Sequence, residues 1–191
     1  MKYIDEFRDP ALARQLVAQI RREATRPVRL MEFCGGHTHA IFHFGLRQLL
    51  EGKVALSSGP GCPVCVTAAA DLDRAIALAD VPGVVLATFG DMIRVPGSQG
   101  TLQDARAHGA DVRVVYSPLD ALKIAHQHPN REVVFLGVGF ETTAPGIAAA
   151  LVQAQQEDLT NFSVLSLHKL TPPAMRAILD AGEVALDGII G

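Results

Sequence analysis

All three cysteines of this chain lie in two short motifs that are also rich in glycine. The first motif, residues 33–39, has the sequence FCGGHTH, and the second, residues 59–65, has the sequence GPGCPVC. A thiolate is both a nucleophile and a ligand for soft metal ions. The two motifs therefore predict a site for a metal ion, for thiol chemistry, or for both.

The first motif places Cys34 directly after an expected strand and just before an expected helix. A helix N-terminus carries partial positive charge and free N–H groups, which favour a thiolate over a thiol. Gly35 and Gly36 allow the backbone to approach a bound group closely. His37 and His39 add two imidazoles that could bind a metal or donate protons. The alternative is that Cys34 is a small buried side chain and that the glycines only form a turn.

The second motif contains a Cys-x-x-Cys loop formed by Cys62 and Cys65. Two cysteines at this spacing can close a redox-active disulfide or supply two ligands of a zinc ion. Cys34 and His37 form a Cys-x-x-His pair, so the two motifs together could also provide a structural zinc site with three cysteines and one histidine. A thiol–disulfide oxidoreductase and a structural zinc-binding module therefore both stay open, besides a site for another metal.

A third group of candidate residues, Glu141, Thr142 and Thr143, follows another expected strand. Asp91 and His168 also come after expected strands and give weaker signals of the same kind. The carboxyl ends of parallel strands share one edge of a sheet, so these residues are expected on the same rim as the cysteines. Glu141 could be a catalytic acid or base, or a hydrogen-bonding partner of a diatomic ligand or a nucleotide. The alternative is that this group only caps the helix that follows it.

The elements that must position these motifs alternate between helix and strand. Asp9 is a good N-cap and Pro10 suits the first helical position, so the first helix is expected to begin there with an apolar stripe of Leu12, Leu16, Val17 and Ile20. Strands are expected at residues 28–33, 54–57, 84–89, 112–116, 132–138, 163–167 and 187–191. Further helices are expected at residues 38–51, 67–79, 101–108, from 118 onward, 144–155 and 171–180.

This alternation indicates an α/β fold built on a parallel, Rossmann-like sheet with right-handed crossovers. The segment 125–131, which contains His, Pro and Asn, is the best candidate for a domain boundary. We therefore expect an N-terminal helix at residues 1–25 and a first α/β domain at residues 26–128 that holds both cysteine motifs. Residues 129–191 are expected to begin a second, similar α/β domain that is incomplete, because two strand–helix units cannot easily cover both faces of a parallel sheet.

Composition excludes several classes of protein. The net charge of −3 lacks the strongly basic surface that nucleic-acid binding needs, and no apolar run approaches the ~18 residues of a membrane helix. An odd number of cysteines argues against a secreted disulfide framework and favours the reducing cytoplasm. The phosphate-loop motif is absent, and Gly137 and Gly139 match only the first two glycines of a dinucleotide fingerprint.

Three segments of the chain resemble the HypD family of nickel–iron hydrogenase maturation proteins. These segments, CGGHTH at residues 34–39, GPGCPVC at residues 59–65 and GFETT at residues 139–143, occur in that order and loop context in the family. The resemblance implies a scaffold on which iron acquires two cyanides and one carbon monoxide, together with a small HypC-type partner. The cyanides would come through HypE- and HypF-type proteins.

The resemblance also implies a role for each motif residue. Cys34 would be the ligand to the iron, and Cys62 and Cys65 would be a redox-active pair. A cleft between two α/β domains would be lined by the remaining motif residues, which are His37, Thr38, His39, Glu141, Thr142 and Thr143. The chemistry is compatible with this expectation, because thiolates bind soft metals and cyanide nitrogens accept hydrogen bonds.

The chain differs from the family pattern in one respect. HypD proteins continue well beyond this length and carry a 4Fe–4S cluster on four further cysteines, whereas no cysteine follows Cys65 here. The ligands of that cluster are therefore absent from this chain. We interpret the chain as an N-terminal fragment of a HypD-like protein, a metal-centre scaffold with possible thiol–disulfide activity.

Overall fold

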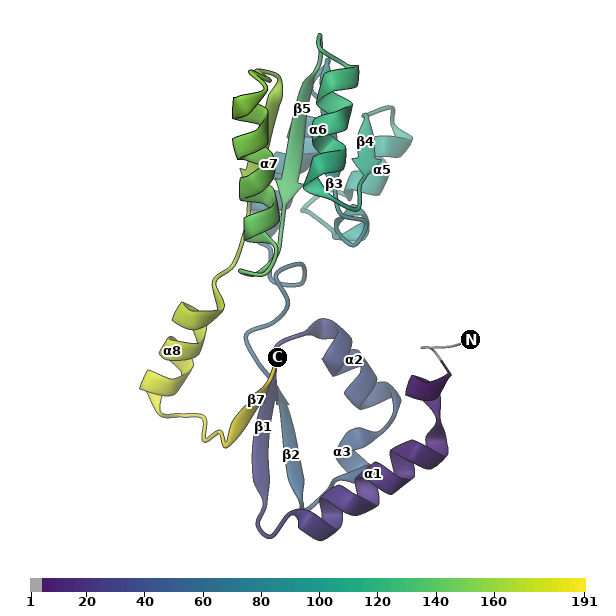
Figure 1. The fold of residues 1–191 in the computed structure, drawn as a ribbon, viewed down its shortest axis with the longest axis vertical. Helices are drawn as coiled ribbons and strands as arrows, with labels where there is room; N and C mark the ends of the chain where they lie inside the picture. Colours follow the sequence, from purple (N-terminus) through teal and green to yellow (C-terminus); the bar gives the residue numbers. More distant parts are fainter. Residues whose placement is uncertain (1–4) are drawn as a thin grey trace. The chain divides into compact units, whose positions relative to one another are not determined.

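The computed structural model of this chain describes residues 5–191 and divides into two compact units. The first unit comprises Met1–Gly61 and Arg176–Gly191, and the second comprises Cys62–Met175. In Figure 1 the second unit contains the teal and green elements, and the first contains the purple and blue elements with the yellow end of the chain. Parallel strands and intervening helices make up both units, which confirms the predicted α/β class.

The first unit is built around a parallel sheet in the strand order β2-β1-β7. Its strands are β1 (Val28–Glu32), β2 (Val54–Ser58) and β7 (Gly188–Ile190). The N-terminal part of this unit contains the helical segments η1 (Glu6–Arg8), α1 (Pro10–Glu23), α2 (Gly35–His43) and α3 (Leu46–Leu49). The loop that leaves β1 leads into α2, so the first cysteine motif lies at the carboxyl end of the central strand.

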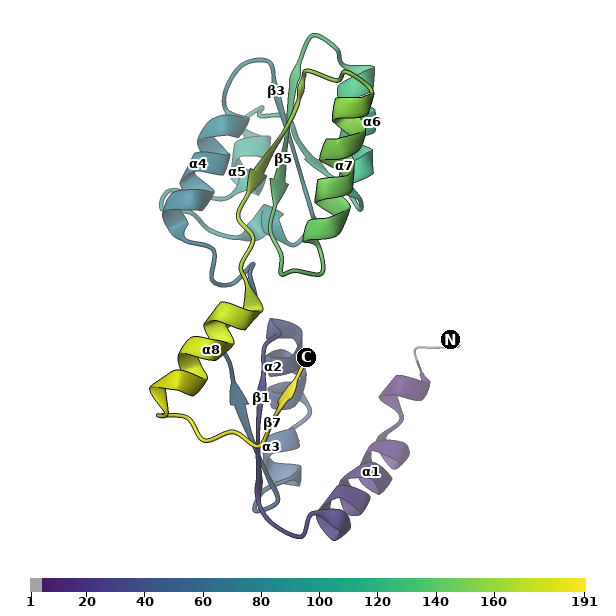
Figure 2. The same ribbon diagram turned by 60° about the vertical axis from the view of Figure 1, so that its left-hand side comes forward.

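The second unit is a three-layered α/β structure around a parallel sheet in the order β4-β3-β5-β6. Its strands are β3 (Val84–Thr88), β4 (Val112–Val114), β5 (Glu132–Gly137) and β6 (Phe162–Ser166). Its helices are α4 (Ala69–Ala79), η2 (Met92–Arg94), α5 (Leu102–Ala107), α6 (Pro118–Gln127) and α7 (Ala144–Gln156). One hydrophobic cluster joins the sheet to α4 and α5, and a second joins it to α6 and α7. Figure 2 shows α4 and α5 on one side of the sheet and α6 and α7 on the other.

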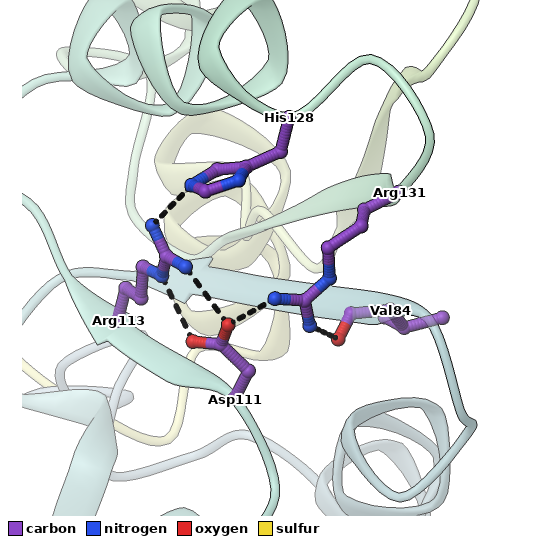
Figure 3. A network of polar contacts seen from close by, with 5 residues as sticks. All are labelled: Val84, Asp111, Arg113, His128 and Arg131. Carbon is purple, nitrogen blue, oxygen red and sulfur yellow. Dashed lines mark hydrogen bonds and ion pairs between the residues drawn. The ribbon is translucent and has the colours of Figure 1, made fainter.

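A polar network ties together the segments that enter the strands of the second unit (Figure 3). Both carboxylate oxygens of Asp111 accept hydrogen bonds from Arg113, at 2.8 and 2.9 Å, and Arg131 donates to the same carboxylate at 2.6 Å. Arg131 also donates to the carbonyl of Val84, and Arg113 contacts the ring of His128. The Arg113 hydrogen bonds, helped by Arg131 and opposed by burial, lower the pKa of Asp111 from 3.8 to about 2. This network lies at the amino ends of the strands, whereas the motif loops follow their carboxyl ends.

The structure corrects the expected domain boundary. β5 pairs with β3 from Val84↔Glu132 to Thr88↔Leu136, so residues on both sides of position 128 belong to one sheet. The last strand, β7, pairs with β1 of the first unit instead of beginning a second domain. The division after the second unit falls within α8 (Thr171–Ala181). Sequence patterns identified these strands but contain little information about which strands pair over more than a hundred residues.

The helix expected at residues 38–51 is two helices in the structure. α2 begins earlier, at Gly35, and the chain turns at Gly45, whose φ of 63° is left-handed. Glycine adopts this conformation without the steric cost that a Cβ imposes. The expected start of α1 is confirmed, because the Asp9 carboxylate accepts the N–H groups of Ala11 and Leu12 at 2.7 and 3.3 Å.

The apolar stripe of α1 is exposed. Leu12, Leu16 and Ile20 are 45%, 50% and 40% accessible to solvent. The predicted helix is therefore present, but its apolar side does not enter the core of the first unit. In the part of the chain that the structure describes, no helix combines the length and the apolar content that crossing a membrane requires.

Candidate functional site

Cys34 lies immediately beyond β1, at the N-cap position of α2, and its side chain is exposed. The carbonyl of Cys34 accepts the N–H of Thr38 at 3.0 Å, so the helix begins at the motif itself. Among the described residues, the Cys34 side chain makes no capping hydrogen bond. The thiol is therefore held at a helix N-terminus, where the partial positive charge favours a thiolate or a bound anion.

Glu32, which the sequence analysis did not single out, is buried directly below this loop. Glu32 is 2% exposed, and its Oε2 atom accepts the backbone N–H of Cys34 at 2.9 Å. Its Oε1 accepts the hydroxyl of Thr38 in a short hydrogen bond. Burial alone would raise the pKa of Glu32, but hydrogen bonds from Thr38, Ser58 and the Cys34 amide lower it below 4.5. A glutamate flanked by the apolar residues Met31 and Phe33 at the end of a strand was the signal that could have revealed it.

Three of the motif side chains on α2 differ in their surroundings. The hydroxyl of Thr38 donates its hydrogen to Glu32, so in this structure that hydrogen is not directed at a ligand. The ring of His39 stacks on that of His43 with 5.4 Å between centroids. The Nδ1 atom of His37 is buried and has no hydrogen-bond partner among the residues that the structure describes. Since buried polar atoms are normally paired, His37 is the imidazole best suited to bind an added group.

The start of the second motif packs against the end of β1. The N–H of Gly59 donates to the carbonyl of Glu32 at 2.7 Å. A Cβ on Gly59 would lie 2.9 Å from that carbonyl oxygen, so a larger residue would push the two segments apart. Gly61 has a φ of 100°, a backbone conformation that favours glycine. Gly59 therefore allows a close approach of two segments, and Gly61 allows a turn.

The two cysteines of the second motif belong to the second unit. Cys62 is partly buried and Cys65 is exposed. The carbonyl of Cys62 accepts the N–H of Val66 at 3.0 Å, and the hydroxyl of Thr67 donates to the carbonyl of Pro63 at 2.6 Å. Between the cysteines, Val64 packs against the hydrophobic cluster of the sheet. The Cys-x-x-Cys segment is therefore an anchored turn, with Thr67 as a support that the sequence analysis did not identify.

The GFETT segment leaves β5 in a conformation that depends on close packing. A Cβ on Gly139 would lie 2.0 Å from the hydroxyl oxygen of Thr143, so only glycine fits there. The hydroxyl of Thr143 donates to the carbonyl of Phe140 at 3.0 Å. The Nε2 atom of His168 lies 3.1 Å from the same hydroxyl, and its Nδ1 atom lies 2.8 Å from the hydroxyl of Ser166.

These contacts define the protonation of His168. The hydroxyl hydrogen of Thr143 is directed at a carbonyl, so the Nε2 atom of His168 must be the donor and its Nδ1 atom the acceptor from Ser166. Burial also lowers the pKa of His168 below 6.5, which favours this neutral form. His168 therefore holds the Gly139–Thr143 loop in place.

Glu141 and Thr142 have different surroundings, although they belong to the same segment. The Oε1 atom of Glu141 accepts the N–H of Thr171, the first residue of α8, at 2.7 Å. The backbone N–H of Glu141 itself has the largest effect and lowers the pKa of this carboxyl group. Burial opposes the shift, and the backbone and side chain of Thr171 lower the pKa further. Thr142 is exposed. The geometry thus makes Glu141 an ionised group that stabilises a helix N-terminus, while Thr142 faces solvent.

The order of the strands in the sheet also draws attention to the GFETT segment, residues 139–143. From β3 the chain first adds β4 on one side and then β5 on the other, so the strand order reverses between β3 and β5. Ligands of open parallel sheets bind outside the carboxyl ends of the strands at such a point. The GFETT segment follows β5, and Asp91 follows β3. A hollow of about 590 Å³ lies beside Asp91. Its lining consists of Gly90, Asp91, Ile93, Arg94, Gln103, Arg106 and Val114.

The predicted site residues thus fall into two groups. Cys34, His37, Thr38 and His39 belong to the first unit, and Cys62, Cys65, Glu141, Thr142 and Thr143 belong to the second. Across residues 5–191, no cluster of three or more His, Cys, Asp or Glu side chains has the arrangement of a metal site. A zinc site of three cysteines and one histidine would need residues from both units, and it stays a prediction.

Fold and site together define an α/β protein with Rossmann-like parallel sheets that presents thiol and imidazole groups where the strands end. Residues 11–191 match the family HypD, described as the hydrogenase formation hypA family. The chain belongs to the HypD family, which confirms the resemblance inferred from the three motifs.

Several relatives are named hydrogenase maturation factor HypD. The chain is 57% identical over 199 residues to that of Azotobacter vinelandii, 52% over 198 residues to that of Rhodobacter capsulatus and 47% over 197 residues to that of Escherichia coli strain K12. All of this chain is covered in each comparison, against 52%, 52% and 53% of the respective relative. The chain therefore spans about half the length of the curated relatives it matches.

Proposed function

We propose that this chain is the iron-capturing part of a hydrogenase maturation scaffold. Cys34 binds the iron that acquires two cyanides and one carbon monoxide, in a complex with a HypC-type partner in the cytoplasm. The observation that carries this proposal is the exposed thiol of Cys34 at the N-terminus of α2. A thiolate at that position suits a soft low-spin iron, and membership of a family described by hydrogenase formation supports the proposal.

The imidazoles and hydroxyls of the motifs have separate roles in this proposal. His37, whose buried Nδ1 atom has no partner within the described residues, donates or accepts at the bound iron group. Thr142 and His39 are exposed and can donate to cyanide nitrogens. Thr38 and Thr143 direct their hydroxyl hydrogens at protein acceptors, so they hold the two loops in position.

Cys62 and Cys65 form the proposed redox pair. Conversion of the two thiols into one disulfide releases two electrons and two protons, which the assembly of the centre would take up. The pair lies on a turn anchored by Thr67 and Val64, so the two sulfurs are carried by a defined segment. Return to the dithiol would use the 4Fe–4S cluster of the full-length family, whose cysteine ligands this chain lacks, and a HypE-type protein would deliver the cyanide.

A thiol–disulfide oxidoreductase is the second candidate, because both cysteines of the Cys-x-x-Cys turn belong to the second unit and the turn is anchored there. Metal analysis of protein purified with and without air separates these functions. Stoichiometric zinc under both conditions would instead support the structural zinc module. A reversible disulfide between Cys62 and Cys65 without any metal would favour the oxidoreductase.

The decisive experiment is anaerobic co-purification of the chain with a HypC-type partner, followed by infrared spectroscopy. We expect cyanide and carbonyl stretching bands in the wild type and their complete loss in Cys34→Ser, because a hydroxyl is a poor ligand for soft iron. Cys62→Ser is the matched control, since it removes a thiol from the other unit and should leave iron bound. Equal iron content in Cys34→Ser and wild type would contradict the ligand assignment.

A further inference from the structure

Cys34 occupies a position that helices usually reserve for a capping side chain. Ser, Thr, Asp and Asn are preferred at the N-cap because their oxygen accepts an N–H of the first turn. Among the described residues, Cys34 makes no such bond, and its side chain is exposed instead. The thiol therefore does not hold its own segment, and other contacts fix the start of α2.

Glu32 supplies these contacts from two residues upstream. Its Oε2 atom accepts the N–H of Cys34 at 2.9 Å, and its Oε1 atom accepts the hydroxyl of Thr38, which lies in the first turn of α2. The Ser58 hydroxyl, 3.4 Å from that of Thr38, adjoins the same group. A carboxylate at a helix N-terminus is also favoured by the dipole of the helix.

The backbone of Glu32 is fixed as firmly as its side chain. Its carbonyl accepts the N–H of Gly59 at 2.7 Å, and it pairs with Ser58 on β2 and Ile190 on β7. The residue is 2% exposed, so its carboxylate depends on these donors in place of water. Both the carboxylate and the strand that carries it therefore have one well-defined position.

We propose that Glu32 is a positioning residue for Cys34. By accepting the N–H of Cys34 and the hydroxyl of Thr38, it fixes the backbone at the start of α2, so that the Cys34 side chain stays exposed and available to a ligand. Thr38 acts through Glu32, as the second donor that orients the carboxylate, and not by contacting the bound group. The importance of this device for iron rests on the function proposed above, but the device itself concerns the thiol and is tested without iron.

The test uses protein in which Cys62 and Cys65 are replaced by Ser, so that Cys34 is the thiol that reacts. Glu32→Gln keeps the size of the side chain but replaces one carboxylate oxygen by an NH2 group, so one of the two donors, the Cys34 N–H or the Thr38 hydroxyl, faces a donor in place of an acceptor. We expect hydrogen exchange at the Cys34 amide, followed by NMR, to be about tenfold faster or more after loss of this charge-assisted bond. The plateau rate of iodoacetamide alkylation at alkaline pH should fall several-fold, because the loosened segment no longer holds the sulfur in its exposed position.

A matched pair at Thr38 separates positioning from general damage to the fold. Thr38→Val removes the hydroxyl but keeps the shape, and it should reproduce both changes in weaker form. Thr38→Ser keeps the hydroxyl and should restore wild-type exchange and alkylation. If Glu32→Gln does not fold, this pair decides the question.

Unchanged exchange and alkylation in folded Glu32→Gln, or equal effects of Thr38→Ser and Thr38→Val, would overturn the positioning role. Changed thiol behaviour together with failure of the wild type to capture iron would instead contradict the proposed function and leave the positioning role intact. The two proposals are therefore tested by separate readouts.

Discussion

At the scale of single residues, the motifs combine side chains that face outward with side chains that hold the loops. Cys34 and Thr142 are exposed, whereas the hydroxyls of Thr38 and Thr143 are hydrogen-bonded inside their own units. Gly139 belongs to the second kind, because its missing Cβ makes room for Thr143. A motif of this type therefore includes more residues than those that touch a ligand.

His168 provides a prediction at the same scale, because burial lowers its pKa below 6.5. In the unfolded chain this imidazole binds a proton at about 6.5, whereas in the folded protein it binds one only at lower pH. Its contribution to stability is therefore complete above pH 6.5 and is lost as the pH falls from that value toward the folded pKa. We expect urea unfolding of His168→Gln to depend less on pH over this window than unfolding of the wild type.

The exposed His108 offers the control for this experiment. His108→Gln should retain the pH dependence that comes from His168, since it removes an imidazole but leaves His168 in place. An NMR titration in which His168 takes up its proton at or above pH 6.5 would contradict the argument.

At the scale of helices and strands, the sequence predicted element positions well where local chemistry determines them. The cap formed by Asp9 is present as expected, and β3 is buried along its whole length. The helix expected at residues 101–108 begins with a capping box formed by Thr101 and Asp104. The predicted helix at residues 38–51 failed at Gly45, because apolar periodicity continued through a residue that turns the chain. The strand-end positions of Cys34 and Glu141 were predicted correctly, since alternation of strands and helices fixes them.

Gly45 and Gly146 form a matched pair for testing this turn. Gly45→Ala places a Cβ at a φ of 63°, where neighbouring atoms leave room but the left-handed backbone is strained. We expect it to destabilise the first unit by about 1 kcal/mol. Gly146 lies within α7 with no atom near its missing Cβ, so Gly146→Ala should stabilise the protein by about 0.5 to 1 kcal/mol. Thermal unfolding of both variants measures the difference, and a stabilising Gly45→Ala would show that the turn is not obligatory.

At the scale of the whole chain, the sequence analysis failed where distant segments meet. Residues 188–190 had the composition of a strand, but nothing local indicated that this strand pairs with β1. The buried state of Glu32 escaped notice for the same reason, because β7 places Ile190 beside it in register. Local patterns thus determine which segments are strands, while the neighbours of each strand depend on the three-dimensional arrangement of the complete sheet.

Asp187 holds this returning segment in place and carries the last prediction. Its carboxylate accepts the N–H of Arg29 at 2.8 Å and the guanidinium of Arg26 at 2.6 Å, while its own N–H donates to the carbonyl of Arg29 at 2.8 Å. The Arg29 amide and then Arg26 lower the pKa of Asp187, so its contribution is complete above pH 3.8 and is lost as the pH falls below that value.

We expect Asp187→Ala to accelerate hydrogen exchange at the amides of β7 at neutral pH, with Asp187→Asn intermediate because it keeps one acceptor. Exchange in β6, which belongs to the other unit, should not change. Asp80→Asn, which alters an exposed carboxylate of the second unit, controls for net charge. Wild-type protein below pH 3.8 should approach the exchange pattern of Asp187→Ala, because protonation removes the same negative charge. Equal acceleration in β6 and β7 would mean that the substitution destabilises the protein as a whole and that Asp187 is not a specific attachment of the returning strand.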